Sequence, residues 1–302
     1  MGRDTVHARR QAGSVRDRVP RIDMRMTTRT AFLMPLYNPD PKALRRTLES
    51  LRAQTVSADI VVVDDGSHLP VDGLCGGTDV TVIRLDCNEG IVGALNRGLV
   101  HILEKKYDYI ARMDCGDTCL PERIAAQQAF MDRELDVDLL GALASIVDED
   151  NRYLFTEGTP GDAKAVQQKL WDNAAFKHPT FFLRARSLAQ LGLYSRHYPH
   201  AEDYEFARRY AKYGVIACLD TVLIVYEKTT GGLSIRNRGA QLRSRLRAQL
   251  RYLDWRRMAA FLGVCRTLAT MVMPASVWAR ASKLYWQRME KGRHPCRTDG
   301  GL

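Results

Sequence analysis

Two aspartates in the segment Asp114-Cys-Gly-Asp117 are the first candidates for chemistry in this chain of 302 residues. They follow a short apolar run and precede Pro121, which can open a helix. Two carboxylates at the end of a strand can hold a hard divalent cation through oxygen, and that cation can neutralise a diphosphate. Asp is also common in turns, so Asp117 acting only as a helix cap stays open as an alternative.

A second acidic pair, Glu202-Asp203, enters a segment of helical periodicity whose apolar positions include Phe206. A carboxylate at the edge of a cleft can take the proton from an acceptor hydroxyl, so the pair is a candidate for general-base chemistry. Acidic residues also favour helix N-termini for electrostatic reasons, which is the structural alternative.

Two further segments carry groups that suit a nucleotide ligand. Asp64-Asp65 follows a β-branched run, and a carboxylate there can accept hydrogen bonds from a base or a ribose. In Asn88-Glu-Gly90 and at Asn96, glycine permits close backbone approach and asparagine can bond a ligand. An ordinary turn and a capped helix N-terminus explain these segments equally well.

Alternating strands and helices must position these residues. Apolar runs predict strands over 30–35, 60–63, 80–85 and 109–113, and periodicity predicts helices from Asp40, over 91–104 and over 121–133. This alternation favours a parallel sheet, whose ligands bind outside the carboxyl ends of the strands. The later pattern is more mixed, with helices expected at 162–172 and 202–213 and strands near 180–183 and 215–225.

The ordered set of motifs resembles the family-2 glycosyltransferases, of GT-A type, of bacterial surface polysaccharide synthesis. The resemblance covers about Ala31 to Ser234. Its elements are Met34-Pro-Leu-Tyr-Asn38, Leu51-Arg-Ala-Gln-Thr55, Val62-Val-Asp-Asp-Gly-Ser67, Asn88-Glu-Gly90, Asn96-Arg-Gly98, Ala111-Arg-Met-Asp114, Leu120-Pro-Glu-Arg123, Gln127, His178-Pro-Thr180 and Ala201-Glu-Asp203. No single element is specific, whereas their joint order is.

The resemblance implies an α/β chain with the GT-A fold, a mostly parallel sheet flanked by helices, and a C-terminal helical tail. It implies inverting transfer of a sugar from a nucleotide-sugar donor to a glycan or lipid-linked acceptor. By position, the donor-binding residues are Pro35, Tyr37, Asn38, Asp65, Asn88, Gly90, Asn96, Arg112 and Asp114. Asp203 matches the general base with Glu202 beside it, while Asp117 and Asp114 would hold Mg²⁺ or Mn²⁺.

Gly116 departs from the family pattern, in which the metal motif commonly reads Asp-x-Asp-Asp. The departure removes one carboxylate, which makes Asp117 the leading metal ligand. A noncatalytic nucleotide-sugar-binding or glycan-binding protein of the same fold is therefore the alternative. A dehydrogenase or a nucleotidyltransferase fits less well, because the first strand is followed by Tyr37-Asn-Pro-Asp-Pro41 and not by a glycine-rich phosphate loop.

The formal net charge of +10 divides the chain into three parts. Residues 1–29 carry eight Arg against three Asp, and we expect a disordered basic tail. Residues 30–235, the expected GT-A domain, carry 22 basic and 29 acidic side chains, whereas residues 236–302 carry 15 and three. An acidic centre with basic ends argues against a nucleic-acid partner and favours a basic, amphipathic, helical C-terminal region.

Residues 258–278 form an apolar stretch interrupted by Arg266 and Pro274. A central Arg disfavours a membrane span, so we expect this stretch to lie in the interface of an anionic membrane. The seven cysteines show no metal or redox spacing, and residues 1–29 contain no signal-peptide core. We therefore expect a cytoplasmic protein, peripheral at the inner face of the membrane. A helical hairpin packed on the catalytic domain is the alternative.

Overall fold

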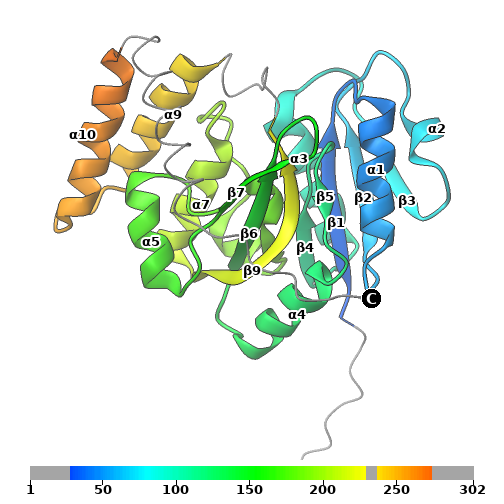
Figure 1. Ribbon diagram of the computed structural model, residues 1–302, viewed down its shortest axis with the longest axis horizontal. Helices are drawn as coiled ribbons and strands as arrows, with labels where there is room; N and C mark the ends of the chain where they lie inside the picture. The colour runs from blue at the N-terminus through cyan, green and yellow to red at the C-terminus, as the bar shows by residue number, and fades with distance from the viewer. Residues whose placement is uncertain (1–27, 229–236, 274–302) are drawn as a thin grey trace, which may run out of the picture.

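A computed structural model describes residues 28–228 and 237–273. Its nine strands form one sheet in the order β3-β2-β1-β4-β8-β6-β9-β5, with β7 paired to β6 (Figure 1). The strands are β1 Thr30–Leu36, β2 Asp59–Asp64, β3 Val80–Arg84, β4 Tyr109–Arg112, β5 Thr118–Cys119, β6 Leu139–Val147, β7 Tyr153–Glu157, β8 Phe182–Arg184 and β9 Ile216–Glu227. The helices are α1 Pro41–Arg52, α2 Asp72–Cys75, α3 Gly90–Glu104, α4 Arg123–Arg133, α5 Ala163–Asp172, α6 Ser187–Leu191, α7 Glu202–Tyr213, α9 Arg238–Arg251 and α10 Met258–Val272, with a 3₁₀ turn, η1, at His178–Thr180.

The alternation of side chains along β1 explains the layered fold. Ala31 and Leu33 join a core formed with α3, α5 and α7, whereas Phe32 and Met34 join the core under α1 and α4. Both sets are buried, because successive residues of a strand point to opposite faces. A continuous apolar run therefore becomes a central strand covered on both faces.

The first half of the sheet is parallel, as the sequence predicts. β1 pairs in parallel with β2 and β4, and β2 pairs in parallel with β3. Helix α1 begins as expected, with the Asp40 side chain accepting a hydrogen bond from the Ala43 N–H at 2.8 Å and Pro41 at the first position. The carboxyl ends of these strands consequently meet along one edge.

The second half of the sheet is mixed. β8 runs antiparallel to both β4 and β6, and β5 and β7 are antiparallel to their neighbours, whereas β6 and β9 are parallel. The expectation of a parallel sheet therefore holds for β1 to β4. Of the antiparallel pairs, only β6 and β7 are joined by a short connection, at residues 148–152, whereas the other antiparallel partners lie far apart in the chain.

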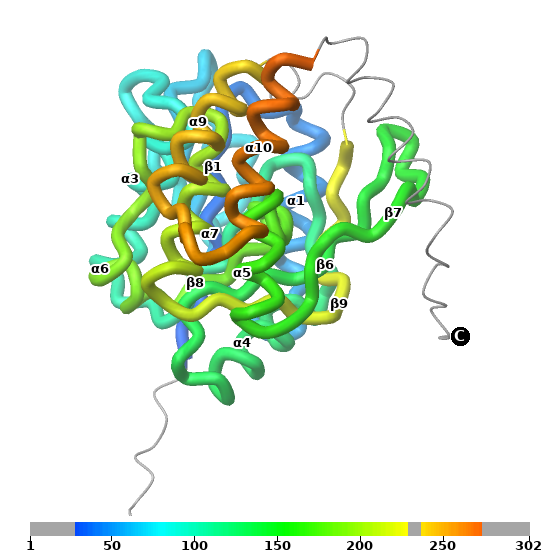
Figure 2. Tube along the Cα trace, turned by 90° about the vertical axis from the view of Figure 1, so that its left-hand side faces the viewer, coloured from blue at the N-terminus to red at the C-terminus, as the bar shows by residue number. Residues whose placement is uncertain are grey.

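Helices α9 and α10 pack side by side on the outer surface of α5 and α7 (Figure 2). Gly263 of α10 lies so close to α5 that a Cβ there would meet the Trp171 carbonyl oxygen at 2.0 Å. Arg266 binds both carboxylate oxygens of Asp172 at 2.6 and 2.7 Å. The described part of the C-terminal region is thus a helical hairpin against the catalytic domain.

None of the helices in residues 28–228 and 237–273 has the length and apolarity that a membrane crossing requires. The expected disorder of the N-terminal tail concerns residues 1–27, which lie outside the described residues, as do the boundary at 235 and the stretch after Met273. Arg29, assigned to the tail from the sequence, bonds through its N–H to Asp108 at 2.9 Å and through its guanidinium to Asp59 at 3.3 Å.

Candidate active site

The end of β1 is tied to the end of β2 by short hydrogen bonds. The Asn38 N–H donates to Ser67 Oγ at 2.8 Å, and Asn38 Oδ1 accepts from the His68 N–H at 2.9 Å. Asn38 takes φ 45°, a conformation that Asn tolerates better than most residues. Tyr37 lies beside this turn with its ring 46% exposed, while Pro35 is buried in the strand. An exposed aromatic face beside a fixed turn suits a nucleotide base.

Asp65 is buried at the end of β2 and accepts a hydrogen bond from the Glu89 N–H at 2.7 Å. Burial raises the pKa of Asp65, although the Glu89 and Gly90 N–H groups oppose the rise. The carboxylate thereby fixes the entry of α3. Asn88 lies exposed in the same turn, where its Oδ1 accepts from the Gly90 N–H at 3.1 Å.

Asn96 lies further along α3 and forms two hydrogen bonds with the backbone of Tyr194. Its Nδ2 donates to the Tyr194 carbonyl and its Oδ1 accepts from the Tyr194 N–H, both at 2.9 Å. Both ends of the amide are therefore occupied by the protein. The structure gives Asn96 a role in placing Tyr194 and leaves its contact with a donor as a prediction.

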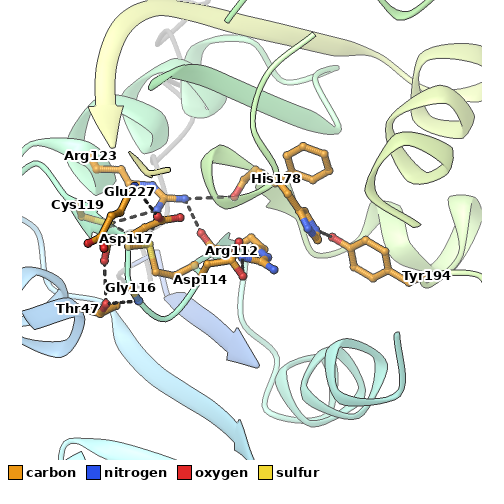
Figure 3. Close-up of polar contacts among 12 residues, drawn as sticks. Thr47, Arg112, Asp114, Gly116, Asp117, Cys119, Arg123, His178, Tyr194 and Glu227 are labelled. Carbon is orange, nitrogen blue, oxygen red and sulfur yellow. Dashed lines mark hydrogen bonds and ion pairs between the residues drawn. The ribbon is translucent and has the colours of Figure 1, made fainter. Parts of the chain in front are cut away.

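Arg112 and Asp114 form an ion pair at the end of β4, in the middle of the site (Figure 3). Arg112 is almost completely buried, and its Nε has no hydrogen-bond acceptor among the described residues. A buried N–H without an acceptor destabilises the folded protein unless a ligand accepts its hydrogen bond. The structure thus brings Arg112 and Asp114 together, and their contact with a donor stays a prediction.

The Asp117 loop is held by the helix α1 (Figure 3). Thr47 Oγ1 donates to the Asp117 carbonyl at 2.8 Å and accepts from the Gly116 N–H at 3.0 Å. Asp117 Oδ1 accepts from the Glu227 N–H at 3.1 Å, while its buried Oδ2 meets no hydrogen-bond donor within the described residues. Burial and the nearby Asp114 carboxylate raise the pKa of Asp117 well above its usual range.

Gly116 takes φ 110°, a conformation open in practice to glycine alone, and a Cβ built there would meet nothing within 4 Å. The missing carboxylate of the family motif thus leaves space beside Asp117. No three His, Cys, Asp or Glu side chains gather as a metal cage in the described part of the chain. The free Oδ2 of Asp117 and the Asp114 carboxylate nevertheless fit a hard cation that also binds donor oxygens.

Glu202 and Asp203 lie at the start of α7, next to the same charges. Glu202 is 9% exposed, and in the described chain no hydrogen bond reaches its Oε2. Burial and the adjacent Asp203 raise the pKa of Glu202 to about 7. Burial also raises the pKa of Asp203, while the Tyr204 N–H, Arg112 and Lys177 oppose the rise. A carboxylate with a raised pKa is a stronger base, as general-base catalysis needs.

Lys177 is a functional candidate that the sequence analysis missed. Its Nζ lies 3.0 Å from Glu157 Oε2 and 4.9 Å from the ring centroid of Tyr226. Burial lowers the pKa of Lys177, but Glu157 and Tyr226 outweigh burial, so the pKa is raised and the ammonium stays charged. Its only sequence signal was its place directly before His178-Pro-Thr180.

His178 is buried on the other side of Arg112, with Nε2 2.8 Å from the Tyr194 hydroxyl (Figure 3). Burial and the Arg112 charge hold the pKa of His178 well below its usual range, so the ring is neutral. Since Asn96 fixes the backbone of Tyr194, these three residues form one support behind Arg112.

Apart from Pro35, which is buried in β1, and Asn96, which binds the Tyr194 backbone, the predicted residues fall into two groups. In the first group, Arg112 and Asp114 lie within electrostatic reach of Asp117, Glu202 and Asp203, and Lys177 lies within reach of Asp117 and Asp203. Tyr37, Asn38, Asp65, Asn88 and Gly90 border the ends of β1 and β2. The two groups form the catalytic end and the nucleotide end of one candidate site.

Several known proteins resemble this chain in sequence. The sequence model described as "Glycosyl transferase family 2" matches residues 31–192. An uncharacterized glycosyltransferase of Haemophilus influenzae is 29% identical over 217 residues, which are 69% of this chain and 79% of that protein. The amylovoran biosynthesis glycosyltransferase AmsE of Erwinia amylovora is 31% identical over 205 residues, which are 64% of this chain and 74% of that protein.

Solved structures share the fold. S. aureus TarS superposes with a TM-score of 0.57 at 18% identity, covering 81% of this chain and 43% of TarS. A shorter TarS structure in complex with UDP-GlcNAc superposes with a TM-score of 0.54 at 20% identity, covering 74% of this chain and 66% of that one. This chain thus spans less than half of the longer TarS structure, and the likeness concerns the fold.

Proposed function

The chain belongs to glycosyl transferase family 2, and on this premise we propose that it is an inverting enzyme of cell-surface polysaccharide synthesis. It moves a sugar from a nucleotide-sugar donor to a glycan or lipid-linked acceptor. The observation that carries the proposal is the meeting of Asp203 with Arg112, Asp114 and Lys177, since both signs of charge that group transfer needs lie in one buried place. The name of the amylovoran enzyme supports the polysaccharide role.

The donor nucleotide binds at the nucleotide end. Tyr37 offers a ring face to the base, and the Asn38–Ser67 turn fixes the chain beneath it. The N-terminus of α3, which begins at Gly90, favours negative charge, so the diphosphate points from there toward Arg112. Asp65 holds this turn in place and faces the nucleoside.

Asp203 accepts the proton of the acceptor hydroxyl as that oxygen attacks the anomeric carbon. The bond from the anomeric carbon to the diphosphate oxygen breaks in the same step, so configuration inverts and no enzyme-bound sugar forms. Arg112 and Lys177 stabilise the charge that develops on the leaving diphosphate. Mg²⁺ or Mn²⁺ held by Asp117 and Asp114 would neutralise part of that charge.

Donor binding and transfer test the proposal. A thermal-shift panel of nucleoside diphosphates and their sugars, with and without Mn²⁺, identifies the donor because a native-state ligand raises the melting temperature. Transfer or hydrolysis of that donor is then measured. We expect turnover that the metal stimulates. Binding without any turnover would favour the noncatalytic alternative, and no binding would reject both.

We further infer that the enzyme lies on an anionic membrane surface through α10. The helix buries Ala260, Gly263, Val264 and Thr267 against the domain and turns an apolar stripe outward. The stripe consists of Met258, Phe261, Leu262, Cys265, Leu268 and Val272, all exposed. Exposed Arg256 and Arg257 directly precede its first residue. An apolar helix face beside cations suits the interface of an anionic bilayer.

Point variants test this surface better than truncation, because removing α9 and α10 would uncover Trp171 and Asp172. Leu262→Glu should abolish flotation with phosphatidylglycerol vesicles at low salt. Leu135→Glu changes an apolar side chain that is equally exposed, outside the stripe, and serves as the control. A parent protein that stays off anionic vesicles, or a Leu262→Glu variant that still floats, would reject membrane docking.

A further inference from the structure

A cavity of about 290 Å³ lies between α5, α7 and the 252–257 connection that joins α9 to α10. It is separate from the catalytic end, although α7 contributes to both. Lys212, which lines the cavity, follows Asp203 by about two and a half helical turns and therefore lies on the opposite face of α7. This volume is near the lower limit of roughly 300–1,000 Å³ for small-molecule sites. One sugar-sized unit is the scale of ligand that fits.

Aromatic rings form much of the cavity wall. Trp171 and Tyr252 are buried, whereas Trp255 is 84% exposed at the rim. The Arg208 guanidinium lies 4.0 Å from the centroid of the Trp171 ring. Aromatic faces of this kind pack against the C–H faces of a sugar ring, while polar groups around them bond its hydroxyls.

The cavity also carries an excess of positive charge. Arg208, Lys212 and Arg256 line it, and none of these cations forms an ion pair with a carboxylate of the described residues. The carboxylate of Asp254 also lines the cavity, but it forms an ion pair at 3.6 Å with Arg257, a residue outside the cavity. The wall therefore favours an anionic ligand.

The buried side chain of Arg208 is a second, independent observation that favours an anionic ligand. It is 3% exposed, and it donates to the Leu170 carbonyl at 3.2 Å and to the Tyr252 carbonyl at 2.8 Å. Its Nε has no acceptor in the described part of the chain. Burial lowers the pKa of Arg208, and an anion in the cavity would offset that cost.

We propose that this cavity is a second carbohydrate site, which binds a sugar unit carrying a carboxylate and so retains an acidic glycan away from the point of transfer. The choice of a glycan rests on the proposed function, whereas the cavity and its charges do not. The ring stacks on the aromatic wall near Trp255, and the carboxylate meets Lys212 and Arg256.

The test is ligand-observed NMR on the full chain, without donor or metal, using the methyl glycosides of glucuronic acid and of glucose. These probes differ only in the carboxylate. We expect the acidic glycoside to bind at least about tenfold more tightly. Lys212→Ala and Arg256→Ala should each weaken it about fivefold or more, whereas Arg243→Ala, which changes an exposed cation of α9 outside the cavity, should not.

Binding should persist in Asp203→Asn, which separates this site from the acceptor position and from failure of transfer itself. Equal binding of both glycosides, or no effect of Lys212→Ala, would overturn the proposal. If inorganic phosphate displaces the acidic glycoside at equal concentration, the cavity binds anions in general and the proposal of a carbohydrate site is wrong. A Lys212→Ala variant that loses vesicle flotation while keeping the probe would assign the cavity to lipid headgroups.

Discussion

The two ends of the active site differ in how far their polar groups are satisfied. At the nucleotide end, Asn38 and Asp65 each accept a hydrogen bond from a backbone N–H. At the catalytic end, Asp117 Oδ2 and Glu202 Oε2 are buried with no partner among the described residues. The Asn38 and Asp65 side chains already have hydrogen-bond partners within the protein. The two buried carboxylate oxygens at the catalytic end have none, which is energetically unfavourable until a ligand binds them.

This difference separates binding from chemistry. A turn fixed by its own hydrogen bonds recognises a nucleotide at little cost of reorganisation. Buried carboxylates with raised pKa values are unfavourable in the free protein but suit proton acceptance and cation binding. Substitutions at the catalytic end should therefore change turnover strongly and leave the fold as stable as before, or more so.

The largest expected effect follows from Asp117→Asn. This variant keeps the shape of the side chain and removes the charge that a cation would bind, so turnover should fall about 1,000-fold, corresponding to about 4 kcal/mol of lost stabilisation. Turnover is measured against metal concentration, with exposed Asp220→Asn as the control. Parental activity with unchanged Mn²⁺ dependence would show that Asp117 does not hold the metal.

Asp203→Asn should lower transfer about 100-fold or more, because the amide cannot accept the acceptor proton. Donor affinity should stay near the parental value, since Asp203 lies at the catalytic end. Measuring kcat alongside the donor Kd checks both statements. If transfer continues at the parental rate, Glu202 is the next candidate for the base.

Lys177→Met should lower kcat about 10- to 100-fold by removing positive charge beside the diphosphate. Lys177→Arg retains the charge and should recover part of the activity. Lys169→Met, at a lysine paired with Asp172 on α5, is the control. Equal losses in the Met and Arg variants would indicate that Lys177 only holds Glu157 in place.

Glu202→Gln should change the stability of the folded protein in a pH-dependent way. The pKa of Glu202 rises from an ordinary 4.5 to about 7 in the folded protein, so neutral Glu202 favours folding at low pH. That contribution is lost as pH rises from about 4.5 through about 7, since the folded protein must then ionise a buried group. Gln stays neutral, so the variant should gain up to about 3 kcal/mol over the parent at pH 8, and much less at pH 5. Urea unfolding at both pH values checks this, and a gain that does not grow with pH would refute it.

The parallel half of the fold could be predicted because its strands are short apolar runs bounded by turn residues. The run Ile60-Val-Val-Val63 is β-branched and is followed by the turn residues Asp64-Asp65-Gly66, so a strand is the structure that its sequence favours most. The candidate active-site carboxylates were singled out for a similar reason, since each follows a strand or opens a helix.

The central strand β6 was not predicted. Its residues, Leu139 to Val147, include Gly and three small residues, and the run is buried on both faces without alternation. Gly141 is required there because a Cβ would meet the Phe176 ring at 2.3 Å, a contact between segments far apart in the chain. Lys177 was missed for a similar reason, since its partners Glu157 and Tyr226 come from two other strands. Long-range partners leave no local pattern.

The backbone at Gly116 limits how a second carboxylate could be added beside Asp117. A Gly116→Asp replacement would find empty space, yet φ 110° would cost an L-residue about 1–3 kcal/mol. An added carboxylate at this position would therefore require the backbone of the turn to change its conformation as well. An engineer seeking tighter metal binding would do better at the neighbouring Cys115, which is half-buried and outside the left-handed region.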